Sequence, residues 1–192
     1  MKSVLKGIEP MAKLYLVRHG KAQTGWDSDY NSGLDELGRQ QARAAAAILA
    51  PLGPLPIVTS PMARTRETSL PLAETWGLTP RIEQRVSEIP SPTLDLTART
   101  AWLIRVMGDR WSNLGAALQR WRKGVIEALL EIDGDTVIFS HFIAINVTAG
   151  EATGDDRVVV FLPDNGSITI IETGAAGLAV LRYGSEAATI IG

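Results

Sequence analysis

The sequence predicts an α/β domain with a largely parallel central sheet. Short apolar runs recur along the chain, and helix-like segments separate them, which is typical of a parallel sheet covered by helices. The chain has 192 residues, of which 45% are hydrophobic; this suits one domain with a sizeable core. We therefore expect one domain over residues 12–192 and an N-terminal extension over residues 1–11.

Each expected strand is a short apolar run that ends at a polar or turn-forming segment. The three central strands are Leu14–Val17, Ile57–Thr59 and Thr136–Phe139. Their composition indicates burial within the sheet. The segment Pro80–Val86 adds a further short strand, and Ser167–Glu172 and Ala176–Tyr183 are expected to pair as an edge hairpin.

Four segments have helical patterns, and several residues mark where these helices begin or end. Asp35 is the expected N-cap of the first helix, and Ser60 followed by Pro61 is expected to begin the second. Because proline lacks a backbone donor, Pro71 is expected to kink or split that second helix. The helical segments are Leu34–Ala50, Pro61–Gly77, Leu96–Ile132 with a break near Gly108, and His141–Gly150.

The composition excludes several classes of protein. A net charge of -2 and an isoelectric point near 5.7 provide no basic field that would recruit nucleic acid or an anionic membrane. The absence of cysteine excludes disulfides, thiolate metal sites and a cysteine nucleophile, and it fits a reducing cytoplasm. No run approaches the roughly 20 apolar residues of a membrane helix, and the first residues lack the core of a signal peptide.

Three loops at the carboxyl ends of the central strands carry the candidate functional residues. The first loop contains Arg18 and His19, the second contains Ser60–Arg64, and the third contains His141. In such sheets, ligands bind in the crevice outside the carboxyl ends of the strands. Two arginines and both histidines of the chain at one edge indicate an anion site, most simply for phosphate, because guanidinium groups bind phosphate oxygens bidentately.

Arginine and neutral histidine in this arrangement suit phosphoryl transfer. Arg64 is expected in the first turn of a helix, where the macrodipole disfavours a cation by about 0.3–1 kcal/mol unless an anion binds nearby; a solvated side chain is the alternative. Neighbouring cations keep a histidine neutral and therefore nucleophilic. They also stabilise the transferring phosphoryl group, and a phosphohistidine divides the transfer into two steps.

Three short motifs resemble those of the histidine phosphatase superfamily, also called phosphoglycerate mutase-like. They are "LVRHG", "TSPMARTRET" and "VIFSH", in the order and spacing of that family over roughly Lys13 to Glu172. The resemblance points to the phosphatase branch and implies a three-layer sandwich with a mostly parallel sheet flanked by helices. It also implies that His19 is the phosphorylated nucleophile and that Arg18, Arg64 and His141 complete the phosphate pocket.

The resemblance further implies an acidic proton donor between the second and third motifs. Glu88 in "VSEIPSP" is the best match, and Glu83 is the nearby competitor. Such an acid would protonate the leaving oxygen and then activate the water that hydrolyses the phosphohistidine. A surface glutamate with no catalytic role is the alternative for Glu88.

Four further residues are expected to contact substrate. Lys21 follows the first motif where many family members have an acidic residue or glutamine, and it would favour an acidic substrate unless it faces solvent. Phe142 replaces the usual glycine after the second histidine and is expected to narrow the pocket or tilt His141. The expected contacts are Gly20, Lys21, Thr24 and Phe142; for Thr24 a plain loop role is the alternative, and Asn165 is interpreted as a turn residue.

The region 96–132 is expected to be a helical insertion or cap between the second and third motifs. Its tryptophans, Trp102, Trp111 and Trp121, either line a cap that selects an apolar leaving group or pack in the core, and the core interpretation is preferred.

Taken together, the sequence predicts a cytoplasmic phosphomonoesterase that acts on a phosphorylated small molecule through a phosphohistidine. No spacing typical of metal ligands appears, so neither a metal nor another cofactor is expected. A homodimer is left open. The alternatives are a phosphoglycerate mutase, a protein phosphohistidine phosphatase and, because of Phe142, a phospho-ligand-binding module of weak activity.

Overall fold

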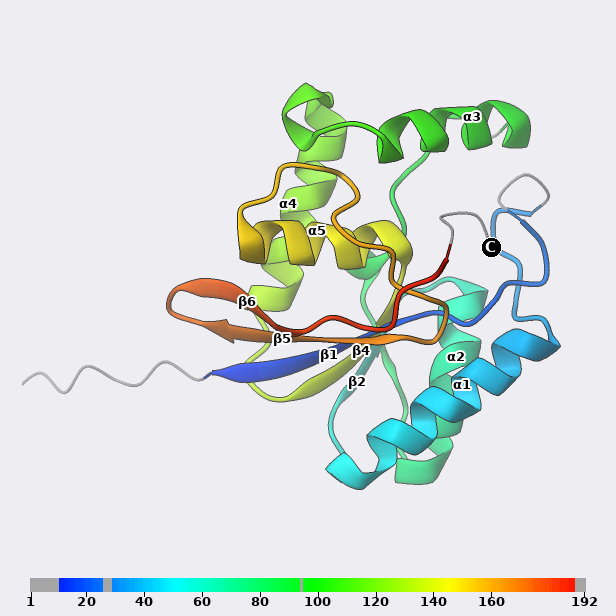
Figure 1. Cartoon of the computed structure of the whole chain (residues 1–192). Helices are drawn as coiled ribbons and strands as arrows, with labels where there is room; N and C mark the ends of the chain where they lie inside the picture. The colour runs from blue at the N-terminus through cyan, green and yellow to red at the C-terminus, as the bar shows by residue number, and fades with distance from the viewer. Residues whose placement is uncertain (1–10, 26–28, 94, 189–192) are drawn as a thin grey trace, which may run out of the picture.

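A mixed sheet of six strands forms the centre of the protein (Figure 1). The computed structural model describes residues 11–25, 29–93 and 95–188. The strand order is β3-β2-β4-β1-β5-β6, and β5 runs in the direction opposite to the other five strands. The strands are β1 (Ala12–Arg18), β2 (Ile57–Thr59), β3 (Arg81–Ile82), β4 (Thr136–Ser140), β5 (Ile168–Gly174) and β6 (Gly177–Arg182).

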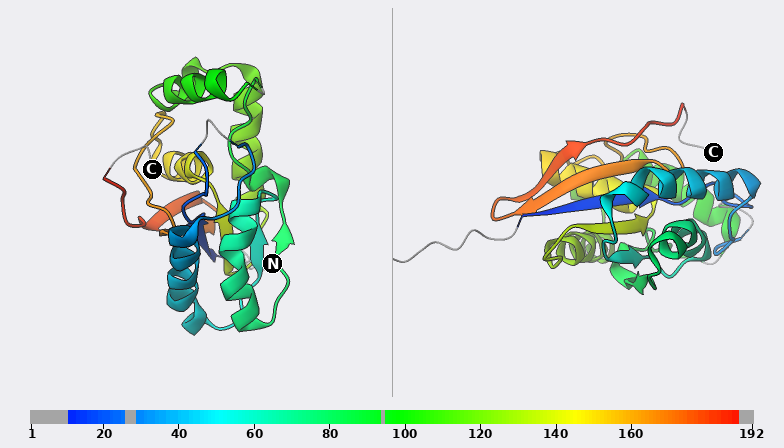
Figure 2. Two further views of the ribbon diagram at one scale, coloured as in Figure 1. Left: turned by 90° about the vertical axis from the view of Figure 1, so that its right-hand side faces the viewer. Right: turned by 90° about the horizontal axis from the view of Figure 1, so that it is seen from below.

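Helices cover both faces of this sheet, so the predicted three-layer architecture is confirmed. The pair α1 and α2 lies on one face and the pair α4 and α5 on the other, while α3 lies farther from the sheet (Figures 1 and 2). The α-helices are α1 (Glu36–Leu49), α2 (Ala63–Trp76), α3 (Leu96–Met107), α4 (Ala116–Leu130) and α5 (Phe142–Thr153). Short 3₁₀ turns occupy Ala50–Leu52, Gln84–Val86 and Trp111–Asn113.

The strand β4 shows how the two layers of helices share the sheet. Because successive side chains of a strand point to opposite faces, Val137 and Phe139 pack in the cluster that contains Leu72 of α2. Ile138 lies in the cluster that contains Leu129 of α4. All five residues of β4 are buried, as expected for a central strand covered on both sides.

The start and the interior of α2 differ from the sequence-based expectation. The helix begins at Ala63 with Met62 as its N-cap, because the Ser60 side chain is engaged with His141 at 2.8 Å and only accepts a longer bond from the Met62 amide at 3.3 Å. Pro71 lies inside one continuous helix, so the expected split is wrong. Leu72 and Ala73, which follow the proline, are buried, and tertiary packing of this kind provides most of the stability of a helix in a protein.

Most other helix and strand predictions are confirmed to within a few residues. The expected strand Pro80–Val86 is an exception, because only Arg81–Ile82 is a strand and Gln84–Val86 forms a 3₁₀ turn. The Asp35 side chain caps α1 by accepting a bond from the Gly38 amide, and Gly77 ends α2 in the left-handed conformation. The expected N-terminal extension falls mainly on residues 1–10, which lie outside the described residues; β1 begins directly after Met11.

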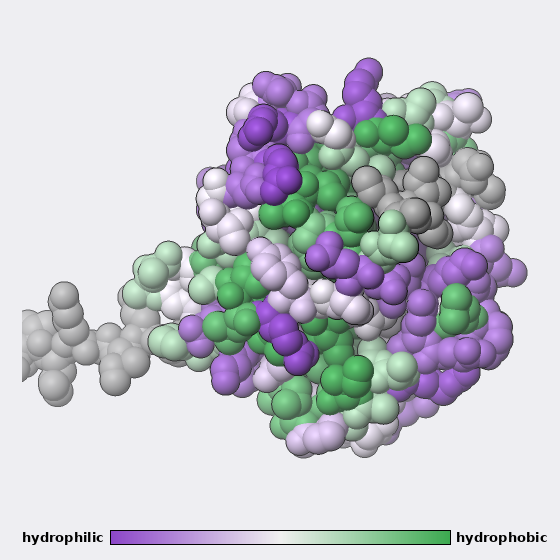
Figure 3. All heavy atoms as spheres, viewed as in Figure 1, coloured by the Kyte–Doolittle hydropathy of each residue, from purple (hydrophilic) through white to green (hydrophobic). Residues whose placement is uncertain are grey.

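The surface visible in Figure 3 carries apolar patches interrupted by polar residues. Within the part of the chain that the structure describes, every helix is too short or too polar to cross a bilayer.

Two glycines allow α1 to approach the segment that follows β1. A Cβ atom on Gly38 would lie 2.1 Å from the Lys21 carbonyl oxygen, and one on Gly20 would lie 2.4 Å from the Gly38 carbonyl oxygen. Real side chains do not tolerate such distances, and both neighbours are backbone atoms that cannot move aside. This contact fixes the turn that begins at His19.

Replacing Gly38 by alanine should therefore destabilise the protein, although alanine is normally the better helix former. We expect Gly38→Ala to lower the free energy of unfolding by about 1–3 kcal/mol through overpacking. Gly124→Ala in α4 is the matched control, because its new Cβ would lie 3.9 Å from its nearest neighbour; it should raise stability by about 0.5–1 kcal/mol. Urea denaturation measures both, and equal effects of the two variants would contradict the close contact.

Candidate active site

The ends of β1, β2 and β4 bring the predicted site residues together. β1 and β4 are parallel, with Arg18 opposite Ser140, so the two histidines follow neighbouring strands at the same level. The His19 amide donates to the Ser140 carbonyl at 3.1 Å. The centroids of the two imidazole rings are 5.2 Å apart.

The hydrogen bonds of His19 determine which of its nitrogens carries the proton and which carries the lone pair. Its Nδ1 lies 2.8 Å from the carbonyl oxygen of Gly20. A carbonyl can only accept, so Nδ1 carries the proton. Nε2 therefore carries the lone pair, and it accepts a bond from Nε of Arg64 at 3.2 Å. The nucleophilic nitrogen thus faces a guanidinium group.

Both histidines are held in the neutral form. Burial lowers the pKa of His19 well below its ordinary value, and the charges of Arg64 and Arg18 lower it further. Burial, Arg64 and His19 likewise lower the pKa of His141. A neutral imidazole retains the lone pair that nucleophilic attack requires.

Arg64 connects the two histidines. Its Nη2 lies 3.3 Å from Nδ1 of His141, whose other ring nitrogen lies 2.8 Å from the Ser60 hydroxyl. A guanidinium only donates, so Nδ1 of His141 accepts and Nε2 carries the proton. Arg64 is in the first turn of α2 and is only 4% exposed, the position in which a bound anion would offset the opposing helix dipole.

Arg18 lies beside the same site on a platform formed by Phe142. Its guanidinium carbon is 5.0 Å from the centroid of the Phe142 ring, and its Nη1 donates to the Pro163 carbonyl at 2.7 Å. Burial lowers the pKa of Arg18 to about 10, which leaves it charged at neutral pH. Its buried Nε has no hydrogen-bond partner among the described residues.

A cavity of about 290 Å³ opens beside these residues. Thr24 lines it and has a buried hydroxyl that lacks a partner within the described part of the chain. Lys21 also lines it, with its ammonium group 3.5 Å from the Asp35 carboxylate. The lining residues are Arg18, His19, Lys21, Ala22, Gln23, Thr24, Gly25, Asp29, Tyr30, Ser32, Arg64, Arg99, Thr100 and Asn165.

Some of the residues predicted to be catalytic or to bind substrate lie elsewhere. Gly20, Glu88, His141 and Phe142 are not among the described residues that line this cavity. Phe142 packs in a core cluster between α3, α4 and α5, so it supports Arg18 and does not narrow the cavity as expected. Gly20 instead donates its amide to the Thr68 hydroxyl at 3.0 Å.

Glu88 is a buried carboxyl group next to the arginines. It is 6% exposed, and its Oε1 accepts a bond from the Ile89 amide at 3.0 Å. Burial raises its pKa, and the charges of Arg64 and Arg18 partly oppose this rise. It lines a second cavity of about 440 Å³ together with Tyr30, which lines both cavities.

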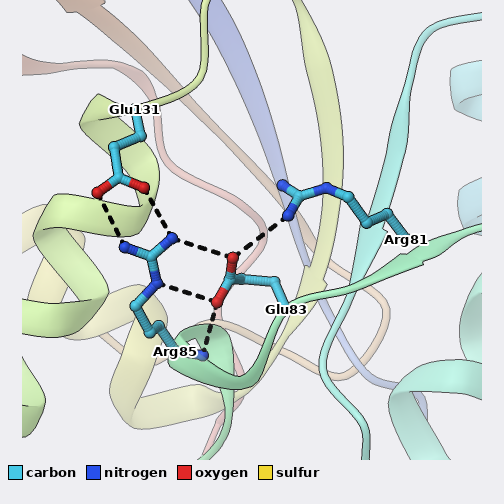
Figure 4. A network of polar contacts seen from close by, with 4 residues as sticks. All are labelled: Arg81, Glu83, Arg85 and Glu131. Carbon is cyan, nitrogen blue, oxygen red and sulfur yellow. Dashed lines mark hydrogen bonds and ion pairs between the residues drawn. The ribbon is translucent and has the colours of Figure 1, made fainter.

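The competitor Glu83 belongs to a network of ion pairs on the surface (Figure 4). Its carboxylate lies 3.0 Å from Arg85 and 3.3 Å from Arg81, and Arg85 also pairs at 2.8 Å with Glu131, the C-cap of α4. Bonds from Arg85 lower the pKa of Glu83 to about 2. Glu83 therefore remains ionised at neutral pH and cannot donate a proton there.

The tryptophans of region 96–132 pack in or against the core, which is the interpretation that the sequence favoured. Trp111 is 1% exposed, and Trp102 and Trp121 pack against its cluster. The ring centroids of Trp111 and Trp121 are 6.0 Å apart. Trp121 also lines the second cavity.

Asn165 and Arg99 are two of several cavity-lining residues that the sequence did not indicate as part of the site. Asn165 is more than a turn residue, because its side-chain amide donates to the His19 carbonyl at 3.0 Å and it lines the first cavity. Arg99 of α3 also lines that cavity and is 3% exposed. The turn motif around Asn165 offered a weak signal, whereas nothing local distinguishes Arg99 from a solvated helix residue.

The three-layer α/β fold has two neutral histidines and two buried arginines at the ends of its strands. This combination defines a class of proteins that use histidine side chains to act on phosphate groups. The chain belongs to the histidine phosphatase superfamily (branch 1), whose family model matches residues 14–186. The resemblance of its three motifs is thereby confirmed.

Individual relatives agree with this membership. Glucosyl-3-phosphoglycerate phosphatase from Mycolicibacterium vanbaalenii is 28% identical over 180 residues, which cover 88% of this chain and 76% of that protein. The protein of the same name from Mycobacterium tuberculosis is 38% identical over 86 residues, or 40% of this chain and 36% of that protein. A solved mycobacterial glucosyl-3-phosphoglycerate phosphatase in complex with VO3 shares the fold, with a TM-score of 0.72, 20% identity and coverage of 91% and 100% of the two chains.

The depressed pKa values of the two histidines make stability depend on pH. The unfolded chain binds protons near the ordinary histidine value of about 6.5 and the folded chain does not, so stability falls as pH falls below that value. The loss approaches about 1.4 kcal/mol per pH unit for each histidine. Urea denaturation at about pH 7.5 and about pH 5.5 measures it.

The variants His19→Asn, His141→Asn and their combination isolate this effect, because the chain has only two histidines. The raised pKa of Glu88 acts in the opposite direction but is common to all four proteins. Each replacement should reduce the change in the free energy of unfolding between the two pH values. The same slope in the wild type and the double variant would contradict buried neutral histidines.

Proposed function

We propose that the protein is a phosphatase that hydrolyses a phosphomonoester through a phosphohistidine on His19. The observation that carries this proposal is the lone pair on Nε2 of His19, which faces the Arg64 guanidinium beside a cavity with orphaned polar atoms. A phosphate would satisfy the unpaired Arg18 Nε and Thr24 hydroxyl. Relatives named as phosphatases of a phosphorylated sugar–glycerate support a small phosphomonoester as substrate.

In the first step, Nε2 of His19 attacks phosphorus and the bond between phosphorus and the leaving oxygen breaks. Arg18 and Arg64 stabilise the equatorial oxygens, where negative charge develops. Glu88, whose pKa is raised by burial, gives its proton to the leaving oxygen. The products are an alcohol, a phosphohistidine and an ionised Glu88.

In the second step, the Glu88 carboxylate takes a proton from water as its oxygen attacks phosphorus. The bond between nitrogen and phosphorus breaks, and its electron pair returns to His19 as neutral imidazole. Orthophosphate is released and Glu88 is protonated again, so the cycle closes without an external acid or base.

The proposal needs no metal or other cofactor. Among the described residues, no group of three or more histidine, aspartate or glutamate side chains is arranged to hold a metal ion. The proposal also places the enzyme in the cytoplasm, which the lack of cysteine fits. The binding-module alternative loses its main argument, because Phe142 lies outside the cavity lining.

His19→Ala and Arg64→Ala should each lower kcat/KM for p-nitrophenyl phosphate by about 10³-fold or more, because each removes a group that acts on the transferring phosphoryl group. Arg66→Ala is the matched control, since Arg66 is an exposed arginine of the same helix. It should leave the rate unchanged. Released phosphate is measured, and activity should persist in chelator.

The phosphohistidine itself can be trapped by denaturing the enzyme during turnover of a substrate with a labelled phosphate. The wild-type protein should then carry a label that acid removes and base does not. The label should be missing from His19→Ala. A wild-type rate in His19→Ala would overturn the proposed mechanism.

Glu88→Gln should slow hydrolysis in a way that depends on the leaving group. An alkoxide leaving group needs a proton, so kcat for glycerol 3-phosphate should fall by about 10²–10⁴-fold, and kcat for p-nitrophenyl phosphate should fall much less. In the wild type, turnover of glycerol 3-phosphate should decline as pH rises through the raised pKa of Glu88. Glu83→Gln is the control and should keep the wild-type ratio between the two substrates; a uniform loss in Glu88→Gln would exclude it as the acid.

A further inference from the structure

The second cavity, beside Glu88, differs in character from the cavity beside His19. Its volume of about 440 Å³ lies within the range of sites for small organic molecules. The aromatic residues Tyr30 and Trp121 line it, and no lysine or arginine is present among the described residues that form it. The first cavity is instead lined by several cations, including Arg18. The first cavity therefore suits an anion, and the second suits an uncharged group.

The two cavities adjoin each other at Arg64. Tyr30 lines both cavities, and its carbonyl accepts a bond from Nη1 of Arg64 at 3.3 Å. Met62, which lines the second cavity, accepts a bond through its sulfur from Nη2 of Arg64, also at 3.3 Å. The guanidinium group that faces Nε2 of His19 thus lies at the boundary between the two cavities.

The position of Glu88 gives this boundary a chemical meaning. Among the described residues, Glu88 lines the second cavity and not the first. Its charge acts on the pKa values of both Arg18 and Arg64, so its carboxyl group lies close to both guanidinium groups. An acid that protonates the leaving oxygen must come within hydrogen-bond distance of it. With the phosphoryl group in the first cavity, the leaving group then extends into the second.

Polar atoms without partners indicate what kind of group the second cavity accepts. The Ser87 hydroxyl and Nε1 of Trp121 are buried and have no hydrogen-bond partner among the described residues, and both residues line this cavity. An indole N–H only donates, so it requires an acceptor such as a hydroxyl oxygen. The aromatic rings of Tyr30 and Trp121 supply apolar area to the same cavity. A ring that carries hydroxyl groups meets both requirements.

Ion pairs join the two elements that supply Ser87 and Trp121 (Figure 4). Ser87 is the C-cap of the 3₁₀ turn Gln84–Val86, and Trp121 belongs to α4. Arg85 of that turn makes a bidentate pair with Glu131, the C-cap of α4, at 3.0 and 2.8 Å. Bidentate pairs within a network are the surface ion pairs that contribute measurably to stability. The turn and the helix are thereby held at a fixed separation.

We propose that the second cavity binds the leaving group of the substrate and that this group is an uncharged ring bearing hydroxyl groups. The faces of Tyr30 and Trp121 pack against the ring, and the Ser87 hydroxyl and the Trp121 N–H bond to its oxygens. The bond that breaks lies at the boundary between the cavities. This inference rests on the proposed function, which places the phosphoryl group beside His19 and the acid at Glu88.

Three phosphomonoesters of primary alcohols test the proposal. Glucose 6-phosphate carries a hydroxylated ring, cyclohexylmethyl phosphate carries a ring without hydroxyls, and glycerol 3-phosphate carries no ring. Their dissociation constants are measured by calorimetry in the His19→Ala background, in which turnover is removed. Glucose 6-phosphate should bind about 10-fold or more tightly than glycerol 3-phosphate, because it adds apolar contact and hydrogen bonds.

Two conservative replacements in this background separate hydrogen bonding from packing. Trp121→Phe retains an aromatic face without the N–H, and Ser87→Ala removes the hydroxyl. Each should weaken binding of glucose 6-phosphate by about 2–10-fold and leave that of cyclohexylmethyl phosphate unchanged. Trp102→Phe is the matched control, because Trp102 packs against the same core cluster as Trp121 but is not among the residues that line either cavity. It should change none of the constants, and thermal melts verify the fold of every variant.

The proposal is overturned if glucose 6-phosphate binds no more tightly than glycerol 3-phosphate, or if none of the three ligands binds at millimolar concentration. It is also overturned if Trp121→Phe and Ser87→Ala weaken all three ligands alike or none of them. Failure of the phosphohistidine mechanism has a different signature, which is turnover that persists in His19→Ala. The same comparison with non-hydrolysable phosphonate analogues does not depend on turnover and would then decide the role of the second cavity.

Discussion

The parallel pairing of β1 with β4 is the constraint on which the site depends. Their register places Arg18 opposite Ser140, and one further bond, from the His19 amide to the Ser140 carbonyl, extends the pairing past the end of β1. Both histidines are thereby delivered at one level of the sheet. A shift of one residue would turn every β1 side chain to the other face, so the core and the site are fixed together.

Arg64 both positions the two imidazole rings and lowers their pKa values. It contacts both imidazole rings, and its charge contributes to keeping each of them neutral. The arrangement is costly for the fold, because it removes several cations from water. The aromatic rings beneath Arg18 and Arg99 and the carbonyls of Pro163 and Tyr30 offset part of that cost. Stability is thus reduced at the place where function requires charge.

Local physics accounts for what the sequence could predict. Apolar runs such as Leu14–Val17 and the cap Asp35 depend on nearest neighbours in the chain, and both were identified. The failures depend on contacts between distant residues. Ser60 binds His141 and so leaves the start of α2 to Met62; packing around Pro71 keeps one helix; and Phe142 turns into the core. Arg99 was missed because only the tertiary fold brings α3 to the cavity.

The location of α3 has a consequence for how such a protein diverges. The helix lies farther from the sheet than α4 and α5 (Figures 1 and 2), while the histidines lie at the ends of strands buried on both faces. Mutations on α3 can accumulate without repacking those strands, whereas mutations near His19 or His141 disturb the core at once. The residues next to the reacting phosphorus are therefore held by the same packing that folds the chain, whereas a cavity residue such as Arg99 is supplied by a helix outside that packing.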